Sequence, residues 1–132
     1  MEVRDDLRYT RDHEWVRREG AEFVVGITDY AQEQLSDIVF VDLPGVGTPL
    51  AAGAAFGSVE AVKAVADLFA PLSGEVTAVN DALGSDPAVV NRSAYDQGWM
   101  VRARIADPSE WDGLLTAVQY RGLLQELGGA GA

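Results

Sequence analysis

The stretch from Gly57 to Gly74 reads GSVEAVKAVADLFAPLSG and carries the only lysine of the chain, Lys63. Of the 10 lysine and arginine residues, all except Lys63 are arginines. An arginine side chain stays charged and offers no amine for acylation, whereas a lysine can lose its proton and be modified. Apart from the N-terminus, Lys63 is therefore the one amine in this protein that an amine-directed modification can reach.

Composition and spacing alone favour a helix for this stretch. Apolar side chains recur at roughly helical intervals, and alanines that suit a helix lie between them: Phe56, Val59, Val62, Ala66 and Phe69. The Asn-Gly or Asp-Gly pair that is typical of a tight hairpin is absent. The residues by themselves thus indicate a helix with a solvated lysine, or a stray lysine in a chain that prefers arginine.

The pattern around Lys63 nevertheless resembles the lipoyl-attachment hairpin of lipoyl carrier proteins. In those carriers an acidic residue lies three positions before the lysine and an alanine follows it directly, as Glu60 and Ala64 do here. A proline follows eight residues after the lysine, a glycine eleven after it and another sixteen before it, which here are Pro71, Gly74 and Gly47. The resemblance therefore predicts a β-hairpin with Lys63 at its turn.

More narrowly, residues 59–64 followed by Asp67 are similar to the family of glycine cleavage system H proteins. The similarity extends to residues 25–32, 37–44 and 91–99, and in total to residues 9–127. The chain departs from the family pattern at a few positions, with Ala61 and Ser93 in place of a serine and an acidic residue, Ala94 in place of a proline, and Ser36 in place of a glycine. Ser36 would be strained if the backbone there needs a positive φ.

This resemblance implies a mainly β fold, a small barrel-sandwich hybrid of the lipoyl- and biotinyl-carrier type. It would consist of short antiparallel strands, one helix in the N-terminal third and two C-terminal helices. The resemblance further implies that lipoate is bound covalently to Lys63. That arm would carry the aminomethyl group of glycine from the glycine decarboxylase (P protein) to the tetrahydrofolate-dependent aminomethyltransferase (T protein). Dihydrolipoyl dehydrogenase (L protein) would reoxidise it, and a lipoate-attaching enzyme would load it.

Four carboxylates are candidate site residues on the same basis. Glu60 and Asp67 are expected near the base of the arm, where they would serve recognition by the attaching enzyme or shape the arm's surroundings. Glu14 and Asp67, with Asp12 as a third, are expected to line a cleft that holds the ammonium of the loaded arm through charge-assisted hydrogen bonds. The alternative for each is a solvated surface carboxylate.

Length and composition limit the other functions. The 132 residues predict one domain, residues 1–132, with flexible ends at 1–7 and 128–132. A net charge of −11 argues against nucleic-acid or anionic-membrane partners and favours electropositive protein surfaces. No apolar run approaches a membrane span, and the absence of cysteine fits a reducing compartment, so we expect a cytoplasmic protein.

The expected elements follow from local patterns. Thr28 and Asp107 are candidate N-caps, and prolines at Pro49 and Pro71 indicate edge or interrupted strands. We expect strands at 13–18, 23–27, 38–43, 75–80 and 99–105, a short extended piece at 48–50, and helices at 28–36, 86–91, 108–114 and 116–127. Pro87 is expected at the first position of its helix.

Other functions remain open from the residues. Biotin carriers flank their lysine with methionines, but Met1 and Met100 are the only methionines here. Lipoyl domains of 2-oxoacid dehydrogenases usually place aspartate before the lysine, where this chain has Val62. An H-like protein that donates lipoyl groups to other carriers and an acidic binding module are the remaining alternatives. An enzyme is disfavoured because the chain has no cysteine, and its one histidine, His13, has no partner at metal-ligand spacing.

Overall fold

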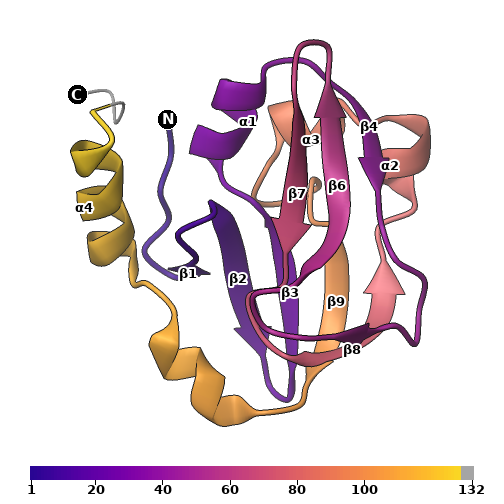
Figure 1. The fold of residues 1–132 in the computed structure, drawn as a ribbon, viewed down its shortest axis with the longest axis vertical. Helices are drawn as coiled ribbons and strands as arrows, with labels where there is room; N and C mark the ends of the chain where they lie inside the picture. Colours follow the sequence, from indigo (N-terminus) through magenta and orange to yellow (C-terminus); the bar gives the residue numbers. More distant parts are fainter. Residues whose placement is uncertain (129–132) are drawn as a thin grey trace.

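The computed structural model describes residues 1–128 and consists mainly of antiparallel β-strands in two sheets (Figure 1). The larger sheet has the strand order β1-β2-β3-β9-β8-β5. Its strands are β1 (Arg8–Tyr9), β2 (Glu14–Glu19), β3 (Glu22–Ile27), β9 (Val101–Ile105), β8 (Gly74–Val79) and β5 (Pro49–Leu50). The smaller sheet has the order β4-β6-β7, formed by β4 (Ile38–Asp42), β6 (Ala55–Ala61) and β7 (Val65–Phe69). The mainly β fold predicted from the sequence is confirmed.

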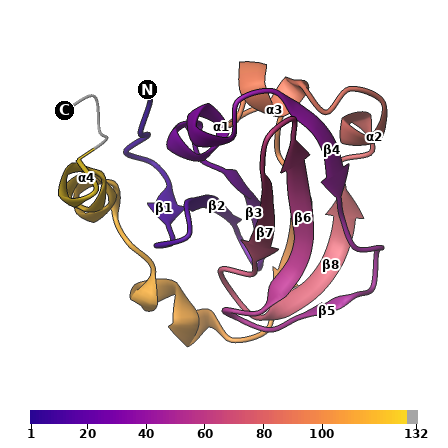
Figure 2. The ribbon, with the colours of Figure 1, turned by 45° about the horizontal axis from the view of Figure 1, so that its top comes forward.

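Short helices surround these sheets. They are α1 (Asp29–Leu35), α2 (Ala82–Ser85), α3 (Val89–Arg92), the 3₁₀-helix η1 (Pro108–Gly113) and α4 (Ala117–Glu126). Figure 2 shows α4 beside β1, apart from the smaller sheet. None of the helices in residues 1–128 is both long enough and apolar enough to cross a membrane.

The core lies mainly between the two sheets. Ile27 of the larger sheet packs with Val59 and Leu68 of the smaller sheet in one buried cluster. The opposite face of the larger sheet is covered by α4, where the buried Trp15 packs with Tyr120. Gly26 faces Trp15 across the strands, and a Cβ atom at Gly26 would lie 2.7 Å from Trp15 Nε1. The lack of a side chain at Gly26 is therefore what lets the indole lie flat on the sheet.

The helical interpretation of residues 57–74 is wrong, because β6 and β7 form a hairpin there. Burial follows a period of two rather than 3.6: Val59 and Ala61 are buried, whereas Glu60 between them is exposed. Gly57 lies so close to β4 that a Cβ atom would be 2.3 Å from Asp42 O. Tertiary packing thus overrides the helix propensity of the alanines.

The two predicted N-caps are correct. The Thr28 hydroxyl accepts a hydrogen bond from Ala31 N at 3.2 Å, and Asp107 accepts one from Ser109 N at 3.0 Å. The element after Asp107 is, however, a 3₁₀-helix that ends at Gly113, so only α4 of the two C-terminal segments is an α-helix. Pro87 is not the first residue of its helix either, because its carbonyl closes a turn with Val90 N and α3 begins at Val89.

The N-terminal segment is bonded to the rest of the domain. Leu7 is buried, Arg4 forms an ion pair with Asp96 at 2.7 Å, and Tyr95 Oη donates to Glu2 O. These contacts oppose the flexibility predicted for residues 1–7. Of the predicted C-terminal tail, residues 129–132 lie outside the described residues.

Candidate functional site

Lys63 lies at the turn of the β6–β7 hairpin, which extends beyond α1 and α3 in Figure 1. Ala61 N donates to Ala64 O at 2.7 Å and closes the turn. Lys63 is exposed, and Val62 before it and Val65 two residues after it are 68% and 66% exposed. The two strands thus fix the base of the turn and present a single primary amine to solvent.

The turn is bonded to the connection between α1 and β4. Val62 N donates to Asp37 O at 3.2 Å. A hollow of about 390 Å³ lies beside the lysine, lined by the end of α1 and the hairpin turn: Gln34, Leu35, Ser36, Asp37, Val62, Lys63 and Ala64. The hairpin tip therefore rests against a second, defined piece of backbone.

Glu60 and Asp67 lie on the solvent face of the smaller sheet. Glu60 is paired with Phe40 on one side and with Val65 on the other, and all three side chains are exposed. Asp67 is two residues further along β7 than Val65, so it shares this face. The structure thus places both predicted carboxylates on one exposed surface below Lys63.

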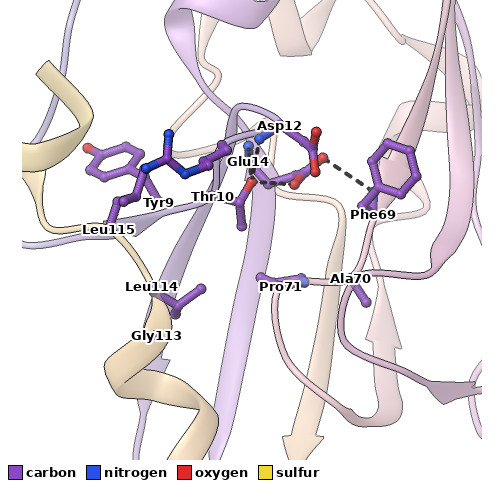
Figure 3. A pocket seen from close by; sticks show the side chains of 12 residues that line it. Tyr9, Thr10, Asp12, Glu14, Phe69, Ala70, Pro71, Gly113, Leu114 and Leu115 are labelled. Atoms are coloured by element: carbon purple, nitrogen blue, oxygen red, sulfur yellow. Dashed lines mark hydrogen bonds between the residues drawn. The ribbon is translucent and has the colours of Figure 1, made fainter. Parts of the chain in front are cut away.

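Glu14 is buried in a different environment, with only 1% of its surface exposed. Its two carboxylate oxygens accept hydrogen bonds from Thr10 Oγ1 at 2.5 Å and from Phe69 N at 3.3 Å (Figure 3). Burial raises the pKa of the Glu14 carboxyl to about 7, which the bonds from Thr10 and Phe69 partly oppose. Glu14 is therefore a titratable group in the neutral pH range and not an ordinary surface carboxylate.

Glu14 and Asp12 line the same pocket of about 230 Å³. Its walls come from the β1–β2 turn, from Phe69 to Pro71 at the end of β7, and from residues 113–115 before α4 (Figure 3). Asp12 is exposed, and its charge adds a smaller upward contribution to the Glu14 pKa. The structure therefore brings the predicted Glu14 and Asp12 together.

Asp67 does not line this pocket, but its strand leads to it. Val65, Asp67 and Phe69 alternate onto one face of β7, and Phe69 is a wall of the pocket. At about 3.3 Å per residue, the path from Val65 to Phe69 is about 13 Å long. One strand face thus connects the lysine turn with the buried carboxylate.

Nothing in the sequence pattern indicated Thr10 or the backbone amide of Phe69 as partners of Glu14. His13, the one histidine, is engaged elsewhere: its Nδ1 lies 2.9 Å from Tyr120 Oη, and its ring packs against Tyr30. Within residues 1–128, no group of three or more His, Asp or Glu side chains could hold a metal ion.

Comparisons with known proteins agree with one another. The glycine cleavage H-protein family model matches residues 7–127. Glycine cleavage system H proteins of Anaeromyxobacter sp. (strain K) and Geobacillus kaustophilus (strain HTA426) are 50% and 53% identical over 126 residues. These alignments cover 96% of this chain and 98% and 99% of the relatives. The crystal structure of a glycine cleavage system H protein from Mycobacterium marinum matches with a TM-score of 0.80 at 40% identity, covering 91% of this chain and 97% of that one.

A two-sheet β fold that presents its one lysine at an exposed hairpin turn is the arrangement of a carrier protein. The chain belongs to the glycine cleavage H-protein family. Members of this family are carrier subunits and not enzymes, and the cofactor that they carry is lipoate.

Proposed function

We propose that Lys63 is the lipoyl attachment site of this carrier and that the chain serves the glycine cleavage system. The observation that carries the proposal is the exposed position of the only lysine at the hairpin turn, within a family whose members carry lipoate. The site fits the group, because acylation of an exposed amine at a turn disturbs no buried contact.

When bound, a lipoyl group would supply the chemistry, which is transfer of the aminomethyl group of glycine from the glycine decarboxylase to the aminomethyltransferase, with dihydrolipoyl dehydrogenase as the enzyme for reoxidation. The chain's own residues hold the attachment point, meet these partners and shelter the cargo. We infer these three partners from the system that gives the relatives their name.

Glu60 and Asp67 are proposed to guide the attaching enzyme to the hairpin. Glu60 lies between the exposed side chains of Phe40 and Val65, so an approaching protein would meet a carboxylate flanked by apolar surface. With a net charge of −11, the protein attracts electropositive surfaces over a distance of about a Debye length. The partner surface that would complement Phe40, Glu60 and Val65 is a basic residue beside an apolar recess.

Glu14 is proposed to hold the cationic cargo of the loaded arm. A buried carboxylate that lines a pocket can bind an ammonium by a charge-assisted hydrogen bond, and the two opposite charges offset each other's loss of hydration. Asp12 lines the same pocket and adds negative potential, and Asp67 lies on the strand face that leads there from the lysine turn.

We also propose that residues 1–132 form one carrier domain, because Ile27 of the larger sheet shares a buried cluster with Val59 and Leu68 of the smaller sheet. The cytoplasmic location expected from the composition stays a prediction.

The test is the intact mass of the protein after incubation with lipoate, ATP and a lipoate–protein ligase, beside Lys63→Arg. One lipoyl adduct on the wild type and none on the variant would support the attachment site. An unmodified, well-folded wild type, or an adduct that persists in Lys63→Arg, would refute it. Reconstitution with glycine, the decarboxylase, the aminomethyltransferase and the dehydrogenase then distinguishes glycine cleavage from donation of lipoyl groups to other carriers.

A further inference from the structure

The side chain of Asn91, in helix α3, makes three hydrogen bonds to the α1–β4 region. Its Nδ2 donates to Ser36 O at 2.8 Å and to Gln32 Oε1 at 3.0 Å, and its Oδ1 accepts from Ile38 N at 3.0 Å. The orientation of the amide is fixed by chemistry, because a backbone carbonyl can only accept and a backbone N–H can only donate. Asn91 therefore clamps the chain on both sides of Asp37.

The clamped backbone is not relaxed. Ser36 has φ 63° and ψ −143°, a conformation that residues with a side chain rarely adopt and glycine adopts readily. Such a conformation persists only where the surrounding structure holds it. Asn91 bonds the carbonyl of Ser36 itself, so it is the side chain placed to hold this turn.

The turn at residues 36–38 also supports the β6–β7 hairpin that carries Lys63. Asp37 O, between the two clamped positions, accepts the hydrogen bond from Val62 N at 3.2 Å, and Val62 precedes Lys63. A continuous chain of bonds thus runs from Asn91 through the 36–38 backbone to the hairpin tip. If the turn relaxes, Asp37 O moves and the tip loses its support.

We propose that Asn91 is a positioning residue for Lys63, which fixes the hairpin tip by holding the strained turn at Ser36. This inference rests on the proposed function, because it concerns how the lysine is presented to the attaching enzyme. Asn91 does not line the hollow beside Lys63, and its side-chain hydrogen bonds go to Gln32, Ser36 and Ile38, so it acts through the turn. Loss of the clamp would lower the fraction of molecules whose hairpin is ready for the enzyme, and the apparent KM rises as that fraction falls.

The chain contains a matched control. The side-chain amide of Asn80 also makes three hydrogen bonds: its Nδ2 donates to Gln97 O and to Trp99 O, each at 2.8 Å, and its Oδ1 accepts from Ala82 N at 3.2 Å. These bonds fix the end of β8 and the start of α2 and do not involve the 36–38 turn. Asn80→Ala therefore removes an equivalent set of bonds without touching the proposed support.

The experiment compares wild type, Asn91→Ala, Asn91→Asp and Asn80→Ala as substrates of a lipoate–protein ligase and by hydrogen exchange of the unlipoylated proteins. For Asn91→Ala we expect KM to rise about fivefold with kcat within about twofold. We also expect the Val62 amide proton to exchange about ten times faster. Asn91→Asp keeps the acceptor for Ile38 N but turns a carboxylate oxygen toward Ser36 O, so it loses the bond to the Ser36 carbonyl. We expect the same rise in KM and the same faster Val62 exchange from it. It serves as the test variant if Asn91→Ala does not fold. Asn80→Ala should lower the melting temperature and leave both readouts at the wild-type level.

Wild-type KM and Val62 exchange in both Asn91 variants would overturn the inference, as would equal changes in Asn80→Ala. The two proposals fail in different ways. If no protein accepts lipoate, the attachment site is refuted, whereas Val62 exchange still decides whether Asn91 supports the hairpin.

Discussion

Protonation of Glu14 should make the stability of this protein depend on pH in an unusual direction. Burial raises the pKa of the folded protein's Glu14 to about 7 from the ordinary value of 4.5. Between these two values the folded protein binds more protons than the unfolded chain, so the free energy of unfolding falls as the pH rises. The stabilising contribution is fully present below pH 4.5 and is lost as the pH rises through about 7.

The size of the effect follows from the same values. Each pH unit between the folded and unfolded pKa corresponds to about 1.4 kcal/mol. The difference between 4.5 and about 7 thus amounts to roughly 3 kcal/mol for a side chain that is only 1% exposed. Glu14→Gln removes the titration and keeps the shape, with an amide oxygen to accept from Phe69 N and an amide nitrogen to meet Thr10 Oγ1.

Urea unfolding of both proteins at several pH values between 5 and 8.5 measures this contribution. We expect the wild type to lose about 2 to 3 kcal/mol relative to Glu14→Gln across the range. Glu60→Gln is the control, because Glu60 is exposed and its substitution should leave the wild-type slope intact. A constant difference between wild type and Glu14→Gln at every pH would refute the raised pKa and the reasoning built on it.

Three further predictions concern the site and its scaffold. Release of the aminomethyl cargo at pH 8 should be faster from Glu14→Gln than from the wild type, because a neutral amide holds an ammonium more weakly than a carboxylate does; equal rates of release would contradict this. Ser36→Gly should stabilise the protein by about 1 kcal/mol in urea unfolding, because glycine adopts the positive φ without strain, and a loss of stability would count against strain at this turn. Gly26→Ala should destabilise it by about 1 to 3 kcal/mol in the same assay, because the new Cβ atom overlaps the buried Trp15 ring; an unchanged midpoint would show that the ring can move.

Local chemistry was the most predictable part of this fold. Thr28 is an N-cap because its hydroxyl accepts a hydrogen bond from the amide three residues ahead, and the Asp107 carboxylate accepts one from the amide two residues ahead. Such contacts lie within one turn of helix, so neighbouring residues suffice to predict them. β1 is different: besides its antiparallel pairing with β2, Tyr9 is bonded through both backbone groups to Leu115, more than a hundred residues away. No local pattern announces a strand of that kind.

The β6–β7 hairpin and the pocket at Glu14 also depend on contacts between distant residues, which local sequence patterns do not predict. Spacing around Lys63 favoured a helix, and only the resemblance to lipoyl carriers predicted the turn, because burial of Val59 and Leu68 against Ile27 depends on a distant strand. Glu14 could be placed on a strand face from its sequence, but its burial could not be predicted. The amide that bonds it belongs to Phe69, 55 residues further along the chain.

Because Lys63 is the one lysine of the chain, cleavage at the hairpin can report whether that lysine is modified. An endoproteinase that cleaves only after lysine has one peptide bond to cut in the whole chain, between Lys63 and Ala64 at the exposed turn. Acylation of the amine removes the positive charge that such a protease recognises. The unmodified fraction of any preparation should therefore fall into two fragments of nearly equal length, while the loaded fraction stays whole, and a single gel lane would give the ratio of the two.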